Sequence, residues 1–265
     1  MQLKGKRAFI TGGARGIGLA VAGELLKRDC AVVISDIEES ALGMARKQLQ
    51  AEGHEVETIV LDVTDSAAVE TSAARLGVID LLVNNAGTVC GGAFLDVTPD
   101  DHARVIQVNL EGLMRVTHAL LGGLIARPEA AIVNLASAAG FVGLPFAGPY
   151  AATKWGVLGF GESLRLELLE TGNQHVRLTH VCPSYVDTEL FRGAAVLKST
   201  RRLTPSGLAR RVVRAVERNR LWVRTPWLVA VTPMLRGILP QAMTDRILRA
   251  SGATRSMLPW QGREQ

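Results

Sequence analysis

Short apolar runs alternate along the chain with longer segments of helical length. The runs are rich in Val, Ile and Leu and do not alternate with polar residues, as expected for strands that are buried on both faces of a sheet. They predict strands at 7–11, 31–35, 56–61, 79–84, 130–136 and 176–181. Helices are predicted between them, for example at 17–28, 38–52 and 101–121. This alternation favours an α/β fold in which helices flank a parallel sheet on both sides.

The pattern becomes less regular beyond Asp187. A helix is predicted at 205–219 and a short strand at 221–225. Four prolines then punctuate the last forty residues, which we expect to form short helices and turns. With 265 residues, 48% of them hydrophobic, the chain is long enough to bury one sizeable core.

A glycine-rich turn joins the first predicted strand to the first predicted helix. In the sequence "ITGGARGIGLA" (10–20), Gly12 suits a tight turn, Gly16 lets a phosphate approach, and Gly18 lets the helix pack close to the sheet. The unpaired N–H groups at the start of a helix attract the phosphates of a nucleotide. A turn with a purely structural role would show the same glycines, so this motif alone does not decide between the two.

Asp36 ends the second predicted strand, 18 residues after Gly18. Its carboxylate could accept hydrogen bonds from an adenosine ribose diol and would repel a 2′-phosphate. Asp36 could instead cap the helix at 38–52. Arg15 points mildly the other way, since a cation before Gly16 could meet a 2′-phosphate. We give more weight to Asp36, so NAD is the predicted cofactor and NADP the alternative.

The other predicted strands also end at polar or unusual residues. Asp62 follows the third strand, Asn84 to Gly87 follow the fourth, Ser137 follows the fifth, and "CPSYVDT" (182–188) follows the sixth. Ligands of open α/β sheets bind beyond the carboxyl ends of the strands. The sequence therefore predicts one ligand site at this edge of the sheet.

Tyr150 and Lys154 lie four residues apart in a predicted helix at 148–170, so they share one face. Such a pair is common on helices for structural reasons alone. Beside a nucleotide site, an ammonium group would lower the pKa of the tyrosine, which normally lies near pH ~10. A tyrosine tuned in this way can exchange a proton with an alcohol or a ketone, and the Ser137 hydroxyl could bind the same oxygen.

The chain carries a set of motifs that resembles the short-chain dehydrogenase/reductase family: "TGGARGIG" (11–18), "NNAG" (84–87), "VNLEG" (108–112), Ser137 and "YAATK" (150–154). The resemblance covers about residues 5–190. It implies a single Rossmann-type domain over 1–265 with a seven-stranded parallel sheet. Within it, 1–190 would form the core, 191–225 the substrate lid and last strand, and 226–265 a C-terminal extension.

The resemblance also implies residue roles. Tyr150 would be the general acid/base, Lys154 would hold the nicotinamide ribose, Ser137 would orient the substrate oxygen, and Asn109 would position a water in a proton relay. The implied cofactor-binding residues are Gly12, Arg15, Gly16, Ile17, Gly18, Asp36, Asp62, Val63, Asn85, Ala86, Gly87, Tyr150, Lys154, Pro183, Val186 and Thr188. One departure is Ser184, which stands where the family usually has glycine after the sixth strand.

The substrate itself is not specified by these motifs. Mostly apolar residues are expected to border it, namely Phe141, Val142, Leu144, Phe146, Tyr185, Leu190 and Phe191. They favour an apolar secondary alcohol or ketone, such as a steroid-like, alicyclic or acyl-chain compound. A nucleotide-sensing module without catalysis is the alternative, but such a module would be expected to lack Ser137, Tyr150 or Lys154.

The charge is distributed unevenly along the chain. Residues 1–191 contain 15 Lys or Arg and 22 Asp or Glu, whereas 192–265 contain 15 Lys or Arg and three acidic residues. The basic region could pack on the core or on a neighbouring subunit, meet an anionic membrane surface, or receive a phosphate-bearing acyl carrier. We prefer packing among these. Aromatic residues are 5% and no nucleic-acid motif is present, so no nucleic-acid partner is expected.

The remaining features concern location and assembly. The three cysteines lie in apolar stretches, the five histidines are scattered, and neither set has the spacing of a metal site. No apolar segment of signal-peptide length begins the sequence, so we expect a cytoplasmic protein. The helix at 148–170 has more apolar residues than one sheet face needs, and the resemblance implies a homodimer or homotetramer.

Overall fold

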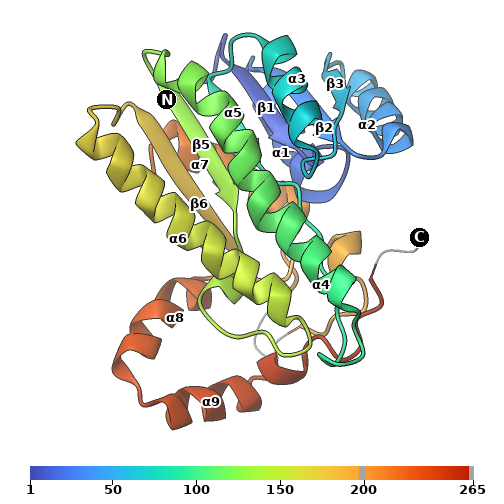
Figure 1. Cartoon of the computed structure of the whole chain (residues 1–265), viewed down its shortest axis with the longest axis vertical. Coiled ribbons are helices and arrows are strands. Elements are labelled where there is room, and N and C mark those ends of the chain that lie inside the picture. The colour runs from blue at the N-terminus through green and yellow to red at the C-terminus, as the bar shows by residue number, and fades with distance from the viewer. Residues whose placement is uncertain (197–200, 263–265) are drawn as a thin grey trace.

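Seven parallel strands form one sheet in the computed structural model, which describes residues 1–196 and 201–262 (Figure 1). Their order across the sheet is β3-β2-β1-β4-β5-β6-β7. The strands are β1 (Arg7–Thr11), β2 (Ala31–Asp36), β3 (Glu57–Val60), β4 (Leu81–Asn84), β5 (Ala130–Leu135), β6 (Val176–Pro183) and β7 (Trp222–Thr225). The predicted parallel α/β fold is confirmed, and each predicted strand agrees with the observed one to within two residues at either end.

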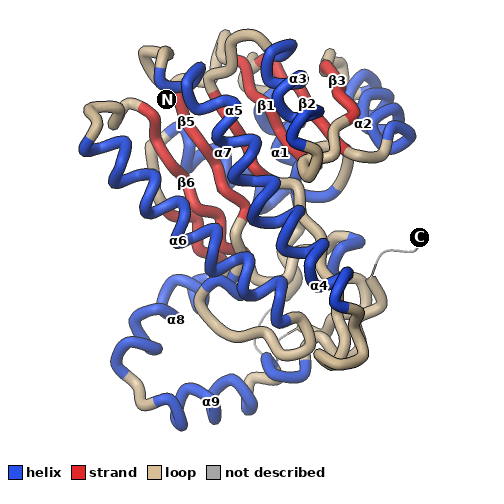
Figure 2. The backbone as a smooth tube through the Cα atoms, viewed as in Figure 1, coloured by secondary structure: helices blue, strands red, loops and turns tan. Residues whose placement is uncertain are grey.

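Helices cover both faces of the sheet (Figures 1 and 2). One apolar cluster joins the sheet to α1, α2 and α7, and a second joins its other face to α3, α5 and α6. The helices are α1 (Gly16–Leu26), α2 (Glu39–Ala51), α3 (Ser66–Leu76), α4 (Pro99–Ile106), α5 (Leu113–Ile125), α6 (Gly148–Glu170), α7 (Pro205–Glu217), α8 (Trp227–Ile238) and α9 (Gln241–Ala250).

The strand order reverses between β1 and β4. β1 pairs with β2 on one side and with β4 on the other, so the connections after these two strands leave in opposite directions. Such a reversal opens a crevice at the carboxyl ends of the strands, where ligands of this architecture bind. The topology thus fixes the place of the site before any side chain is considered.

The helix predicted at 101–121 is longer than expected and is divided into three parts. It begins at Pro99 because the Thr98 hydroxyl accepts a hydrogen bond from the Asp101 N–H at 3.1 Å and caps it. A π-helical segment, η1 (Gln107–Gly112), then separates α4 from α5. Segments of this kind are rare and occur frequently at functional sites.

Helices α8 and α9 form an arm that extends away from the sheet (Figure 1). Apolar side chains on the arm remain exposed: Trp227, Met234, Ile238, Met243 and Ile247. No helix in the described part of the chain is both long and apolar enough to span a bilayer. Residues 197–200 of the predicted lid and 263–265 of the predicted extension lie outside the described residues.

His180 of β6 is fully buried beneath α6. Gly161 of α6 makes room for the ring, since a Cβ at this glycine would lie 2.0 Å from His180 Cε1. Burial lowers the pKa of His180 to about 4, and the nearby Glu162 carboxylate only partly opposes this effect. The histidine is therefore neutral in the folded protein at neutral pH.

This burial predicts a loss of stability in weak acid. The folded pKa lies below the unfolded value, so the contribution is complete above about pH 6.5 and declines as the pH falls towards about 4. Between about pH 7.5 and 5, wild type should lose about 2 kcal/mol of unfolding free energy that His180→Phe does not lose. Urea titrations at the two pH values measure this, with the exposed His118→Gln as control. An equal loss in His180→Phe and wild type would contradict the assignment.

Candidate active site

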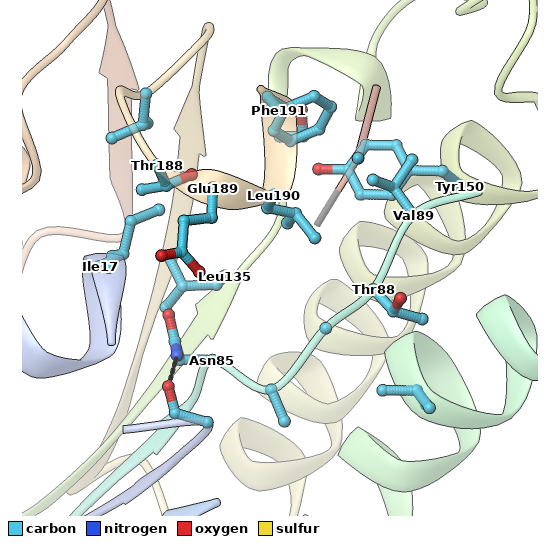
Figure 3. A pocket seen from close by; sticks show the side chains of 18 of the residues that line it. Ile17, Asn85, Thr88, Val89, Leu135, Tyr150, Thr188, Glu189, Leu190 and Phe191 are labelled. Atoms are coloured by element: carbon cyan, nitrogen blue, oxygen red, sulfur yellow. Dashed lines mark hydrogen bonds between the residues drawn. The ribbon is translucent and has the colours of Figure 1, made fainter. Parts of the chain in front are cut away.

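A cleft of about 1410 Å³ lies at the carboxyl ends of the strands around the β1–β4 reversal. Its walls come from the β1–α1 turn, the segments that follow β2, β3, β4, β5 and β6, parts of α4 and η1, the start of α6, and residues 260–262. Figure 3 shows Ile17 and Thr188 on one side of this cleft and Tyr150 and Val89 on the other. A volume of this size exceeds that of an ordinary small-ligand pocket and is suited to a dinucleotide together with a substrate.

The glycine-rich turn passes so close to neighbouring segments that side chains at two of its positions would crowd them. Gly12 and Gly16 have φ of +60° and +57°, a region that favours glycine. A Cβ at Gly12 would lie 2.8 Å from Ala86 Cα, and one at Gly16 would lie 3.2 Å from Thr188 Cγ2. The first turn of α1 contains no acidic residue, and the Arg15 side chain does not cap it. These features fit a pyrophosphate held at the start of α1.

Gly18 does not line the cleft but allows the turn to close. A Cβ on this residue would lie 2.4 Å from the Gly12 carbonyl oxygen, as expected for the glycine that lets α1 pack close to the sheet. The Asn85 side-chain amide donates to the same Gly12 oxygen at 2.7 Å and to the Thr11 oxygen at 3.0 Å. Sequence reasoning missed Gly13, where a Cβ would lie 2.7 Å from Ile34 Cβ.

Asp36 lines the cleft at the end of β2 and is largely buried. Its carboxylate accepts a hydrogen bond from the Ala14 N–H at 3.4 Å and one from the Glu38 N–H at 3.3 Å. The residue at the N-cap of α2 is Glu38, so Asp36 is not the cap itself. The Arg15 guanidinium pairs with Glu38 and, at 3.6 Å, with Glu189.

The other predicted cofactor residues are brought together in the same cleft. Asp62 also accepts two hydrogen bonds from Thr64, which shape the turn after β3. The remaining residues of this group that line the cleft are Ile17, Val63, Asn85, Ala86, Gly87, Pro183, Val186 and Thr188, with Ser184 beside them.

Ser137, Tyr150 and Lys154 converge in the cleft from the end of β5 and the start of α6. The Ser137 hydroxyl accepts a hydrogen bond from the Ala139 N–H at 3.1 Å, and its proximity to the Tyr150 phenol acts to lower the pKa of that phenol. Lys154 Nζ donates to the Leu135 carbonyl oxygen at 2.8 Å and lies 5.5 Å from the centre of the Tyr150 ring. Tyr150 and Lys154 are each only 5% exposed, so the fields of their charges are weakly screened by water.

The expectation that the pKa of Tyr150 is lowered is wrong. Burial raises the pKa of Tyr150 above its usual value, and the nearby Ser137 hydroxyl only partly opposes this. Burial likewise lowers the pKa of Lys154 to about 8. Desolvation is the largest cause of both pKa shifts, and the phenol keeps its proton at neutral pH.

Asn109 lies in the π-helical segment η1 and does not line the cleft. Its side chain accepts a hydrogen bond from the Thr88 N–H at 2.7 Å and donates to the Thr88 carbonyl oxygen at 2.8 Å. It also donates to the Thr153 hydroxyl at 3.3 Å. Asn109 therefore holds the segment after β4 in place, and its part in a proton relay stays a prediction.

The substrate end of the cleft differs from the expectation. Of the seven residues expected to border the substrate, only Leu190 and Phe191 line the cleft, and the Phe191 ring meets the Tyr150 ring edge-on at 5.5 Å. Leu144, Phe146 and Tyr185 pack in the cluster behind Tyr150. Phe141 instead contacts Trp222 of β7, and Val142 does not line the cleft.

Sequence reasoning missed part of this wall. Thr88, Val89 and Cys90 line it after β4, and Trp260 to Gly262 line it near the end of the chain. The first group directly follows the "NNAG" motif, which could have indicated it. No sequence signal places Trp260 there, because its position depends on how the arm returns to the body.

Known proteins match both the sequence and the fold. The family model for short chain dehydrogenase matches residues 6–195, more than half of the chain. The ketoacyl reductase HetN of Nostoc sp. is 30% identical over 262 residues, covering 94% of this chain and 90% of that protein.

Two solved structures have the same fold. A short chain dehydrogenase/reductase from Burkholderia phymatum in complex with NAD has a TM-score of 0.82 at 27% identity, covering 94% of this chain and 96% of that one. An alcohol dehydrogenase from the archaeon Thermococcus sibiricus, complexed with 5-hydroxy-NADP, has a TM-score of 0.70 at 28% identity, covering 80% and 90%. Since the family model, the relatives and the cleft agree, this chain belongs to the short chain dehydrogenase family of oxidoreductases.

Proposed function

We propose that this protein transfers hydride between a nicotinamide cofactor, NAD in preference to NADP, and an apolar secondary alcohol or ketone. One observation carries the proposal. The Ser137 hydroxyl, the Tyr150 phenol and the Lys154 ammonium converge in the cleft whose other end is the glycine-rich turn. A proton donor beside a dinucleotide site is the arrangement that carbonyl reduction needs.

The side chains suggest how the proton moves. In reduction, Tyr150 gives its proton to the carbonyl oxygen while Ser137 donates a hydrogen bond to the same oxygen or to the phenolate. The bound dinucleotide supplies the hydride to the carbonyl carbon. Lys154, charged below about pH 8, stabilises the phenolate that forms and holds the nicotinamide ribose. In alcohol oxidation the same groups act in reverse.

The wall of the cleft supports an apolar substrate. Val89, Leu190, Phe191 and Trp260 present apolar surface at the end that contains Tyr150. The relative HetN is named a ketoacyl reductase, which supports a ketone as one partner of the reaction. An alicyclic, steroid-like or acyl-chain compound fits this surface better than a small charged acid.

Replacement of Tyr150 by Phe tests the proposed reaction. The variant keeps the ring and its contact with Phe191 but has no proton to transfer. NADH-dependent reduction of a ketone panel, followed by absorbance, should fall by about a thousandfold. The dissociation constant of NADH, measured by fluorescence, should stay within about threefold of wild type, because the phosphates are held elsewhere. Turnover equal to wild type would remove Tyr150 from the reaction.

The preference for NAD rests on the charges around the adenosine end. Asp36 is a buried carboxylate at the predicted place of the ribose, and Arg15 is engaged by Glu38 and Glu189. The Asp36 carboxylate would repel the 2′-phosphate of NADP. The Arg15 guanidinium, which could otherwise bind that phosphate, is already paired with two carboxylates.

Asp36→Asn isolates the contribution of this charge, since the amide oxygen can still accept a backbone hydrogen bond. The ratio of the NADPH to the NADH dissociation constant should fall by about tenfold or more in this variant. Fluorescence titration of both cofactors gives the ratio. Tighter binding of NADPH than of NADH by wild type would show that the preference has been assigned the wrong way.

We also propose that the protein forms a homodimer or homotetramer through α6, on which Trp155, Leu166 and Leu169 are 44%, 48% and 47% exposed. Light scattering at micromolar concentration should give a multiple of 28.4 kDa, and a mass of 28.4 kDa alone would contradict this.

The exposed arm is the part that would meet an anionic membrane instead. Salt-sensitive co-sedimentation with anionic vesicles would support that alternative.

A further inference from the structure

We propose that residues 256–262, of which 260–262 line the cleft, form a fixed wall at its substrate end, and that Trp260 in this wall limits the size of the substrate. The proposal rests on the proposed function, because it concerns the ketone or alcohol in that reaction. Its basis is that the end of the described chain, far in sequence from Tyr150, lines the same cleft.

The path of the chain brings this segment to the cleft. After β7, at one edge of the sheet, the chain passes below α6 through the arm and reaches the region beside α4 (Figure 1). The short helix η4 (Ala253–Arg255) then leads into residues 256–262. The arm thus carries the chain from the sheet edge to the cleft.

The start of the wall is firmly seated on the segment after β6. Ser256 accepts a hydrogen bond from the Ala195 N–H through its carbonyl oxygen and one from the Tyr185 hydroxyl through Oγ, both at 2.7 Å. Ser256 and Met257 are each 2% exposed. Met257 packs in the apolar cluster that contains Tyr150.

The end of the wall is held on both sides of the cleft. Trp260 Nε1 donates to the Leu190 carbonyl oxygen at 3.0 Å, and the Gln261 N–H donates to the Arg192 carbonyl oxygen at 3.0 Å. On the opposite side, a Cβ at Gly91 would lie 2.6 Å from Trp260 Cε3. The indole therefore bridges the segment after β4 and the segment after β6.

Gly193 shows that the main chains also meet closely. Its φ is +82°, and a Cβ at this residue would lie 2.4 Å from the Pro259 carbonyl oxygen. Hydrogen bonds and two glycine contacts thus fix a bulky ring at the rim of an apolar site. A rigid indole in this position excludes substrates that a smaller side chain would admit.

A graded series of ketones measures the limit: cyclohexanone, 2-decalone and a tricyclic alicyclic ketone. For Trp260→Ala, kcat/KM for the larger ketones relative to cyclohexanone should rise by about tenfold or more over wild type. The same kcat/KM ratio for Trp260→Phe should lie between the values for wild type and Trp260→Ala. The control Trp227→Ala removes an exposed indole of α8 that does not line the cleft and should leave the ratio unchanged. NADH dissociation constants within about threefold of wild type show that each variant is folded.

Two measurements keep this inference separate from the proposed function. Suppose that wild type reduces ketones and that Trp260→Ala has the same ratio of kcat/KM for the larger ketones to kcat/KM for cyclohexanone. The proposal that Trp260 limits substrate size is then wrong, whereas the proposed function stands. If no variant reduces a ketone, the proposed function fails, and calorimetric binding of the same ketones to the NADH-loaded protein decides on the wall. A higher affinity of Trp260→Ala for the larger ketones, relative to cyclohexanone and compared with wild type, supports the proposed size limit. Equal ratios, or no binding to either protein, overturn it.

Discussion

The contact between the glycine-rich turn and the end of β4 is the constraint on which the rest of the site depends. Asn85 ties the carbonyl oxygens of Thr11 and Gly12 to the segment after β4, and Gly18 brings α1 against the same Gly12 oxygen. A side chain at Gly12 or Gly18 would force these elements apart. This contact lies where the strand order reverses, so it holds the turn and the start of α1 at the edge of the sheet where the cleft opens.

Burial then determines the chemistry at the other end of the cleft. The same removal of water raises the pKa of Tyr150 and lowers that of Lys154, so both groups are pushed towards their neutral forms. A protonated phenol next to a lysine that is charged below about pH 8 suits proton donation to a ketone. Negative charge that develops on the phenol would be stabilised by the lysine in a poorly screened site. Burial thus keeps the phenol protonated and leaves Lys154 as the cation beside it.

Much of the fold could be predicted because its signals are local. Unbroken apolar runs mark buried strands, and the spacing of Gly12, Gly16 and Gly18 marks the first turn. The strand ends that carry Asp36, Asn85 and Ser137 meet in space because parallel strands share one carboxyl edge.

The errors came from effects that are not local. Phe141 follows Ser137 closely in sequence, but the 3-10 helix η2 (Ala138–Gly140) separates the two residues. The Phe141 ring therefore contacts Trp222 and does not line the cleft. The balance between burial and charge at Tyr150 depends on packing that a spacing of four residues does not specify. Trp260 lines the cleft only because the arm returns to the body, so its position could not be predicted from nearby residues.

The most direct test of the central claim follows the hydrogen itself. Wild-type protein is incubated with a ketone that it reduces and with NADH that carries deuterium on either face of nicotinamide C4. If the cleft aligns the nicotinamide with the carbonyl held by Ser137 and Tyr150, the deuterium from one face alone will appear on the carbinol carbon, as mass spectrometry and NMR will show. Product without deuterium from either label, or equal transfer from both faces, would contradict the account.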